Sequence, residues 1–378
     1  MKRIPFVRPR LPDPAAWAPR LEESYKQHWF SNFGPVHARF EAELRRRFCP
    51  EGRDVTLSSN CTIGLAAALV ALEVQGRVAI PSFTFPATAQ AVLMAGCQPA
   101  YIDADPQNWH MSAEHLSSEL ASGDISAVIA VRVFGFCIDL SYLEALCRRY
   151  SVPLIIDSAA SLPGQIRPLE MVGGQGDVEV FSLHATKVFA IGEGGAIMSR
   201  RSLRSALRAA LNFGICDGAL QPRGFNGKLP EVSCGIGLEV LETIQREVEL
   251  RRAIVNWYRD LFDKLPVQQP GDWAGSPPWQ TYPVLMPSPE TAELITAEAD
   301  ASGIDLRRYY RPALHRAYPS SADQFVSLPV TDRLAGGMVC FPVLSDMDSG
   351  ERIRLERLCA RIRDFCQEPY PIGRNQAL

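Results

Sequence analysis

The stretch Val178–Ser199 reads VEVFSLHATKVFAIGEGGAIMS and places one lysine between two apolar segments. Residues 178–183 and 196–199 have the composition of buried strands. Lys187 is the only charged residue in the apolar middle of the stretch. Burial disfavours the ammonium form of lysine, and a neutral amine is a nucleophile that can form a Schiff base. The alternative is a lysine at a strand end whose ammonium group reaches solvent.

Polar and glycine residues surround this lysine on both sides. Ser182 and His184 precede it, and strand alternation predicts that the two share one side of the strand end. Gly192, Gly194 and Gly195 follow it and allow a tight turn or a close approach to a ligand. For His184 the alternative is a histidine packed within the fold.

Composition restricts the class of protein. The chain has 378 residues, 47% of them apolar and 21% charged, which is ordinary for a soluble globular protein of two domains. We expect these domains at 1–245 and 246–378. The net charge of −3 without a basic run argues against nucleic acid as a partner. No apolar run is long enough to span a bilayer, so we expect no membrane partner.

The cysteines and the N-terminus indicate the compartment. Ten cysteines are scattered without a C-x-x-C pair, which favours reduced thiols in a cytoplasmic protein over a disulfide framework or a metal site. Lys2 and Arg3 are not followed by an apolar segment, so we expect no signal peptide.

Before residue 160, apolar strand-like runs alternate with helical patterns. Such alternation predicts an α/β fold with a mostly parallel sheet covered on both faces, which binds ligands at the carboxyl ends of its strands. The expected strands are 55–58, 78–81, 100–103, 127–131 and 154–157. The expected helices are 15–28, 36–48, 63–74, 87–95 and 140–150.

After residue 199 the pattern changes to a second, smaller α/β unit. The expected helices are 201–212, 231–265, 291–302 and 350–365, with one strand at 281–286. A glycine-rich loop is expected at 213–230, a linker at 266–278, and irregular structure at 328–343.

Three further groups stand at expected strand ends. Asn60, Cys61 and Thr62 precede a helix, whose N-terminus suits a phosphate, although simple N-capping is the alternative. Asp157 ends an apolar strand and either pairs with a protonated ring nitrogen or caps the next segment. Phe85 either stacks on a flat ring or packs in the core. With Lys187, these are the parts that pyridoxal phosphate requires.

Several motifs resemble one known family over nearly the whole chain. FSLHATK followed by GEGG is similar to its F-S-F-x-x-T-K…G-E-G-G motif, and PSFTFPAT to its P-S-x-T-F-x-A-T motif. Asn60-Cys61-Thr62 stands at its S-G-T, Gly224-Phe225-Asn226 at its G-Y-N, and Phe33-Gly34-Pro35 at its N-terminal G-P. The chain thus resembles the pyridoxal-phosphate-dependent sugar aminotransferases of fold type I (DegT/StrS-like).

This resemblance implies a large domain with a mostly parallel mixed sheet, a smaller C-terminal α/β domain, and a homodimer with shared active sites. It implies transfer of an amino group, with glutamate the expected donor, to a keto group of a nucleotide-linked sugar or related molecule. The implied catalytic residues are Lys187 and Asp157. The implied cofactor-binding residues are Asn60, Cys61, Thr62, Phe85, Asp157, Ala160, Ser182, His184, Lys187 and Asn226, the last in the neighbouring subunit's site. The implied substrate-binding residues are Phe33, Arg132, Glu193, Lys228, Tyr310 and His315.

The chain departs from the family at four positions. Ala160 and Leu162 replace the glutamine and histidine of A-A-Q-A-H-G, Arg132 the histidine of P-V-H-x-Y-G, and Lys228 the arginine of Y-R-M. Arg132 and Lys228 place positive charge at two of these positions, which suggests an acceptor or donor with an anionic group. One alternative is elimination, decarboxylation or carbon–carbon bond formation on a non-sugar substrate. Another is a non-catalytic ligand sensor, and the retained Lys187 and Asp157 argue against the sensor.

Overall fold

The computed structural model describes residues 2–216, 218–318 and 326–367. At its centre is a seven-stranded sheet of order β1-β9-β8-β5-β4-β2-β3. Only β9 runs antiparallel to the other strands, so the sheet is mixed and mostly parallel, as the sequence predicted. The strands are β1 (Arg53–Ser58), β2 (Arg77–Pro81), β3 (Gln98–Ile102), β4 (Ile125–Val131), β5 (Leu154–Asp157), β8 (Val178–Ser182) and β9 (Gly195–Arg200).

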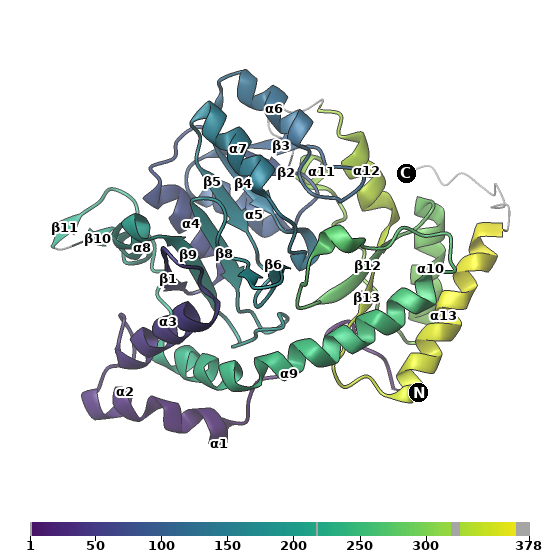
Figure 1. Ribbon diagram of the computed structural model, residues 1–378, viewed down its shortest axis with the longest axis horizontal. Helices are drawn as coiled ribbons and strands as arrows, with labels where there is room; N and C mark the ends of the chain where they lie inside the picture. The colour runs from purple at the N-terminus through teal and green to yellow at the C-terminus, as the bar shows by residue number, and fades with distance from the viewer. Residues whose placement is uncertain (1, 217, 319–325, 368–378) are drawn as a thin grey trace.

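Helices cover both faces of this sheet (Figure 1). Successive strand residues point to opposite faces, so Val78 and Ile80 join one apolar cluster and Ala79 another. The first face packs against α4 (Cys61–Ala71), α5 (Pro86–Met94) and α8 (Arg204–Leu211). The second face packs against α6 (Ala113–Ala121), α7 (Ser141–Tyr150), α3 (Pro35–Phe48) and the start of α9 (Glu231–Phe262).

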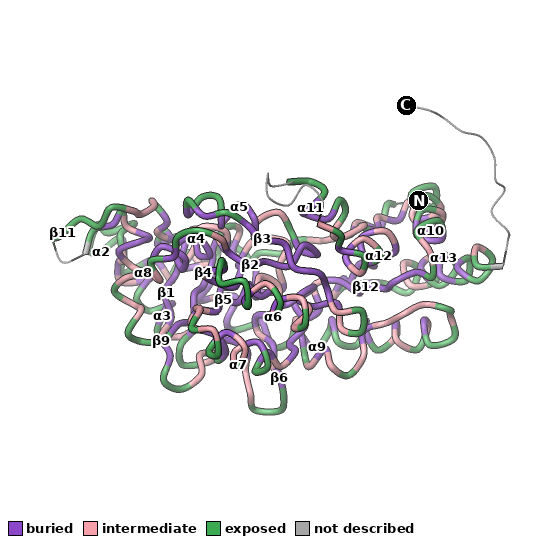
Figure 2. Tube along the Cα trace, turned by 90° about the horizontal axis from the view of Figure 1, so that it is seen from above, coloured by how far each residue is buried: buried purple, intermediate pink, exposed green. Residues whose placement is uncertain are grey.

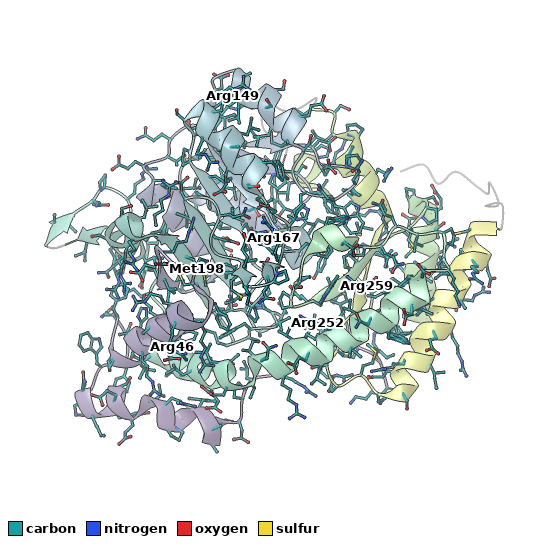
Figure 3. The ribbon with its side chains drawn as sticks, viewed as in Figure 1. Arg46, Arg149, Arg167, Met198, Arg252 and Arg259 are labelled. Atoms are coloured by element: carbon teal, nitrogen blue, oxygen red, sulfur yellow. The ribbon has the colours of Figure 1, made fainter. Side chains whose placement is uncertain are left out.

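Many charged residues of these helices are exposed, whereas Glu41 of α3 and Glu231 of α9 are buried. In Figure 3, Arg149 on α7 and Arg252 on α9 lie at opposite margins of the molecule, whereas Met198 of β9 is in the interior. Figure 2 shows the same layering, with buried strands between more exposed helical faces. Among the described residues, no helix combines the length and the apolar composition needed to cross a bilayer.

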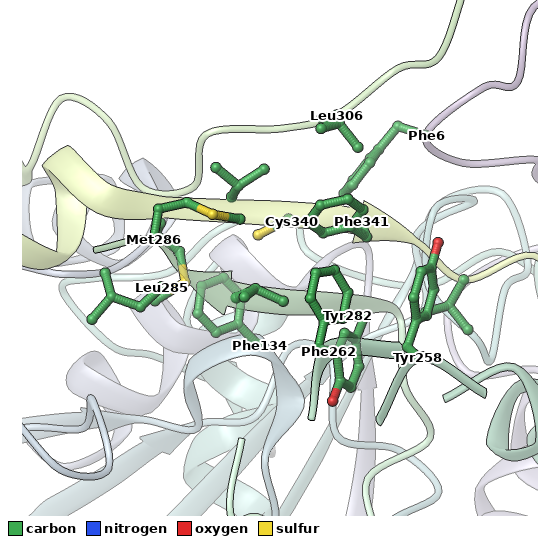
Figure 4. Packing of buried hydrophobic residues seen from close by; sticks show 14 of the residues in the cluster. Phe6, Phe134, Tyr258, Phe262, Tyr282, Leu285, Met286, Leu306, Cys340 and Phe341 are labelled. Carbon is green, nitrogen blue, oxygen red and sulfur yellow. The ribbon is translucent and has the colours of Figure 1, made fainter. Parts of the chain in front are cut away.

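The long helix α9 connects the sheet to the smaller C-terminal unit (Figure 1). Tyr258 and Phe262 of α9 pack against Tyr282 and Phe341, and the rings of Tyr258 and Tyr282 stack at 5.2 Å (Figure 4). This unit contains the antiparallel pair β12 (Thr281–Leu285) and β13 (Met338–Pro342). Its helices are α10 (Pro289–Ala301), α11 (Leu314–Ala317), α12 (Pro329–Gly337) and α13 (Ser349–Gln367).

The N-terminal segment packs on the C-terminal unit. Ile4 forms a β-bridge with Ile304, and Phe6 packs edge to face on Tyr309 at 5.8 Å. After this segment the chain forms α1 (Pro14–Trp17), η1 (Ala18–Leu21) and α2 (Glu22–Gln27) beside α9. The expected division at residue 245 falls inside the continuous helix α9 and stays a prediction.

Three local expectations were wrong. Residues 328–343 are not irregular, because α12 and β13 occupy them. The expected helix 15–28 is divided into three pieces, with Pro19 in the first turn of the middle one, η1. Helix α6 was not predicted, nor were the short hairpins β6 (Gln165–Arg167)–β7 (Glu170–Met171) and β10 (Ile215–Cys216)–β11 (Ala219–Leu220). The single-turn helices η2 (Val133–Gly135), η3 (Arg201–Leu203) and η4 (Asp272–Ala274) complete the fold.

Candidate active site

The loop between β8 and β9 holds Lys187 in a defined position. The Ala185 N–H donates to the Gly192 carbonyl at 2.7 Å, and the Lys187 N–H donates to the His184 carbonyl at 2.8 Å. Gly192 has a φ of 97°, a conformation that favours glycine. A Cβ at Gly195 would lie 2.4 Å from the Ser58 hydroxyl, so glycine permits the close approach of β9 to the end of β1.

Asp157 lies at the carboxyl end of β5 and is 5% exposed. Its carboxylate accepts hydrogen bonds from the Thr88 hydroxyl at 2.9 Å and the Ala159 N–H at 3.1 Å, and the Cys61 thiol lies 3.9 Å away. Burial raises the pKa of Asp157, while these hydrogen bonds and the charge of Lys187 lower it. In the described part of the chain, no ion pair reaches this carboxylate.

Lys187 is half-buried in the same region. Burial lowers the pKa of its amine, and the neighbouring Cys61 and Asp157 oppose that shift. The Lys187 Nζ donates a hydrogen bond to the Gln280 Oε1 at 3.1 Å. The direction of the pKa shift agrees with the expectation of a nucleophilic amine rather than a solvated ammonium group.

A cavity of about 630 Å³ joins these groups. Its volume is within the range of small-molecule sites in proteins. Among its lining residues are twelve that the sequence singled out: Asn60, Cys61, Thr62, Phe85, Arg132, Asp157, Ala160, Ser182, His184, Lys187, Glu193 and Tyr310.

One end of this cavity is the N-terminus of α4. The Asn60 Oδ1 accepts a hydrogen bond from the Ile63 N–H at 2.9 Å, so the capping alternative is correct for this side chain. The remaining backbone N–H groups of the first turn and the Thr62 hydroxyl lie at the cavity and suit a phosphate. Capping by Asn60 therefore leaves these donors available to a ligand.

Ser182 and His184 lie together at the cavity, as strand alternation predicted. The His184 N–H donates to the Ser182 Oγ at 3.3 Å, and the His184 Nδ1 lies 2.9 Å from the Thr186 hydroxyl. The His184 Nε2 lies 3.5 Å from a carboxylate oxygen of Glu193. Phe85, at the start of α5, is 55% exposed and presents its ring at the cavity instead of packing in the core.

An aromatic wall forms the side of the cavity toward the small unit. Tyr310 stacks on Phe134 at 5.2 Å with an interplanar angle of 10°. Burial raises the pKa of Tyr310, which keeps its phenol protonated. Of the two departures near Asp157, Ala160 lines the cavity, whereas Leu162 packs in the cluster with α3.

The structure corrects the expectation that Arg132 offers a free positive charge. Its guanidinium is completely buried and donates to the Glu179 Oε1 at 2.9 Å, the Gln175 Oε1 at 2.9 Å and the Ile138 carbonyl. The residue borders the cavity, but the charge of Glu179 already neutralises its guanidinium. Arg132 therefore stabilises the fold and offers no free charge to a ligand.

Four predicted residues lie away from this chain's own cavity. His315 is buried, with its Nδ1 2.7 Å from the Ser82 hydroxyl. Phe33 packs under the Arg208 guanidinium at 4.5 Å. Lys228 donates to the Asn226 Oδ1 at 2.9 Å. The His315 Nε2 lies 3.2 Å from a carboxylate oxygen of Asp332, so both ring nitrogens of this buried side chain face other groups of the protein and its substrate-binding role stays a prediction.

Sequence reasoning missed two residues that contact the central pair. Thr88 was quoted only as part of a motif, and its hydroxyl contacts Asp157. Gln280, at the start of the small unit, contacts Lys187. The sequence marks this position only by the proline-rich linker that precedes it, which does not indicate a site residue.

The residues present fit pyridoxal phosphate. A half-buried lysine of lowered pKa, a buried carboxylate that forms no ion pair within the described residues, and a helix N-terminus line one cavity. Solved structures agree: an aminotransferase from Bacillus cereus superposes with a TM-score of 0.85 at 26% identity, covering 96% of this chain and all of that one. Fold and site therefore define a pyridoxal-phosphate-dependent aminotransferase.

The chain belongs to the DegT/DnrJ/EryC1/StrS aminotransferase family, whose model matches residues 15–362. Protein Rv3402c of Mycobacterium tuberculosis is 32% identical over 362 residues, 91% of this chain and 86% of that protein. The dTDP-4-amino-4,6-dideoxy-D-glucose transaminase of Escherichia coli is 26% identical, covering 94% and 98%. The structure of DesI with its TDP-sugar product has a TM-score of 0.87 at 28% identity, covering 97% and 95%.

Proposed function

We propose that this enzyme transfers an amino group from an amino acid, with glutamate the expected donor, to a keto group of a nucleotide-linked sugar or a related small molecule. The observation that carries the proposal is the convergence of Lys187 and Asp157 on one cavity of about 630 Å³. The names of the Escherichia coli transaminase and of the DesI product complex support a nucleotide-linked sugar as the acceptor.

Each residue of the cavity has a distinct task in this proposal. When bound, pyridoxal phosphate supplies an aldehyde for covalent attachment and a ring that withdraws electrons. Lys187 would provide the attaching amine and, when free, would move a proton between the two carbons that flank the transferred nitrogen. Asp157 keeps the ring nitrogen protonated, the start of α4 with Ser182 holds the phosphate, and Phe85 stacks on the ring.

Absorption spectroscopy of the purified enzyme tests this assignment. The protein is expected to be yellow, and addition of glutamate should replace the visible band by one at shorter wavelength. Lys187→Ala should remove both the band and amino transfer, whereas Lys264→Ala, at an exposed lysine, should change neither. A visible band and turnover that survive in Lys187→Ala contradict the assignment.

The acceptor is tested by single-turnover assays on the amino-loaded enzyme. Nucleotide-linked keto sugars and simple keto acids are added separately, and return of the visible band is followed. Rapid return with keto acids alone would reject a sugar acceptor. An acceptor with a diphosphate requires a cation, and because Arg132 is paired with Glu179, we assign that task to Lys228.

We further propose that Lys228 and Asn226 act in the cavity of a second copy. Both lie outside their own cavity, beside the hairpin β10–β11, which projects from the molecule in Figure 1. Apolar side chains on this projection are exposed: Phe213 by 54%, Ile215 by 44% and Leu220 by 78%. Apolar exposure of this kind favours contact with another chain.

Complementation in mixed dimers tests the shared site. Lys187→Ala and Asn226→Asp proteins should each be inactive, because the added charge of the second repels the phosphate. In the mixed dimer one site carries both defects and the other carries none, so activity should rise after subunit exchange. No gain after confirmed exchange between two inactive parents rejects the shared site.

A further inference from the structure

Gln280 brings the C-terminal unit into contact with Lys187. This residue stands directly before β12, 93 positions after the lysine, and lines the same cavity. Its Oε1 accepts a hydrogen bond from the Lys187 Nζ at 3.1 Å. This is the contact by which the smaller unit reaches the amine that carries the proposed chemistry.

The backbone on both sides of Gln280 is held firmly. Trp279 is buried, and its carbonyl accepts a hydrogen bond from an Arg251 Nη1 at 3.3 Å. On the other side, the Thr281 hydroxyl donates to the Phe341 carbonyl at 2.8 Å, and Thr281 pairs with Pro342 in the sheet. These contacts fix the direction in which the Gln280 side chain leaves the backbone, so its approach to Lys187 is set by the fold.

An uncharged acceptor has a specific effect on a buried amine. A carboxylate within about 4–6 Å of an ammonium group would raise its pKa by about 1–3 units, because opposite charges favour ionisation. An amide oxygen orients an N–H without adding a charge. Gln280 therefore leaves intact the lowering of the Lys187 pKa that burial causes.

We propose that Gln280 is a positioning residue that orients the free amine of Lys187 without placing a further negative charge beside it. The proposal rests on the catalytic role of Lys187 proposed above. It adds that the amide oxygen of the small unit selects one orientation of Nζ, so that the nitrogen lone pair faces the cavity. A carboxylate at this position would retain the orientation but hold the lysine as an ammonium group.

Competitive labelling measures the ionisation of Lys187 directly. Full-length enzyme loaded with pyridoxamine 5′-phosphate, which leaves Lys187 free, is pulsed with labelled acetic anhydride over a range of pH, and mass spectrometry quantifies the Lys187 peptide. Gln280→Glu should move the labelling midpoint upward by at least about one pH unit. The acid limb of the single-turnover rate profile should move by the same amount.

A second variant tests orientation separately from charge. Gln280→Met keeps the shape of the side chain but removes the acceptor, so the labelling midpoint should not rise. The rate of amino transfer from a saturating donor should fall by about tenfold, the effect of one lost hydrogen bond of about 1.4 kcal/mol, with the donor KM unchanged. Gln280→Met also keeps the test decisive if Gln280→Glu does not fold.

Gln268→Glu is the matched control, because Gln268 lies in the same unit and its side chain contacts only the Gln107 carbonyl in the described structure. Its labelling midpoint and rate should equal those of the unmodified enzyme. An unchanged midpoint in Gln280→Glu, or an unchanged rate in Gln280→Met, overturns the role of Gln280. Failure of the role of Lys187 looks different, because Lys187→Ala would then retain the visible cofactor band.

Discussion

Two pairs of charged residues, Arg132 with Glu179 and Asp157 with Lys187, differ in the partners of their charges. Arg132 and Glu179 form an ion pair of 2.9 Å in which neither side chain is exposed. Ser158 and the Gly173 N–H complete the hydrogen bonds of Glu179. Asp157 and Lys187 face the cavity, and their hydrogen-bond partners, Thr88 and Gln280 among them, are uncharged.

The partners of each charge distinguish the structural charges of this sheet from the functional ones. A buried charge with an opposite charge and a complete set of hydrogen bonds has no capacity left for a ligand. A buried carboxylate with only neutral donors retains the capacity to pair with a cationic ring nitrogen. Burial and charge alone therefore do not identify the site, and the partner of each charge does.

The largest expected effect follows from removing the charge of Asp157. Asp157→Asn should bind the cofactor through Lys187 but lose three or more orders of magnitude in amino transfer, about 4 kcal/mol at 1.4 kcal/mol per tenfold. Stopped-flow absorbance with glutamate measures this rate, and the visible band confirms cofactor binding. Turnover close to that of the unmodified enzyme would make Asp157 a helix cap only.

The next effect concerns stability rather than catalysis. Glu179→Gln leaves the Arg132 charge buried without an opposite charge and should lower the free energy of unfolding by about 3–4 kcal/mol. Urea denaturation measures this loss. Glu170→Gln, at an exposed ion pair of 3.5 Å with Arg167, is the control and should have almost no effect.

A double variant makes the comparison stricter. Adding Arg132→Met to Glu179→Gln removes both charges and should recover much of the lost stability, because replacing a complete buried pair is far less costly than breaking one. The folded double variant should keep its visible cofactor band. Loss of that band would show that the pair belongs to the cofactor site after all.

The smallest effect tests how Asp157 is held. Thr88→Val preserves the shape of the side chain but removes the donor 2.9 Å from the Asp157 Oδ2, so amino transfer should slow by about tenfold. Thr296→Val, whose hydroxyl contacts only the Ala292 carbonyl of α10 in the described structure, should leave the rate unchanged. Equal rates in both variants would mean that Thr88 does not position the carboxylate.

The strand ends could be predicted because their signals are local. Apolar runs on both faces of a parallel sheet identify β5 and β8, and the residue that ends each run must lie at the carboxyl edge. The sequence therefore predicts the correct edge of the sheet for both Asp157 and Ser182. Lys187 followed because no other charge interrupts its apolar neighbours.

The interpretation of Arg132 failed because its environment is not local. Glu179 and Gln175, which neutralise and enclose it, lie more than 40 residues away in the sequence. Gln280 was missed for the same reason, since its contact depends on how the smaller unit packs. Residues 328–343 were misread because β13 is only five residues long and follows two glycines, Gly336 and Gly337.

The N-terminal segment has a consequence for how the chain is made. Ile4 and Arg3 contact Ile304, Asp300 and Asp305, so these two residues bind partners translated some 300 positions later. Domains generally fold in the order of synthesis, but this contact must wait until residues 300–305 have been translated. A nascent chain stalled before residue 300 should therefore leave Arg3 and Ile4 open to proteases.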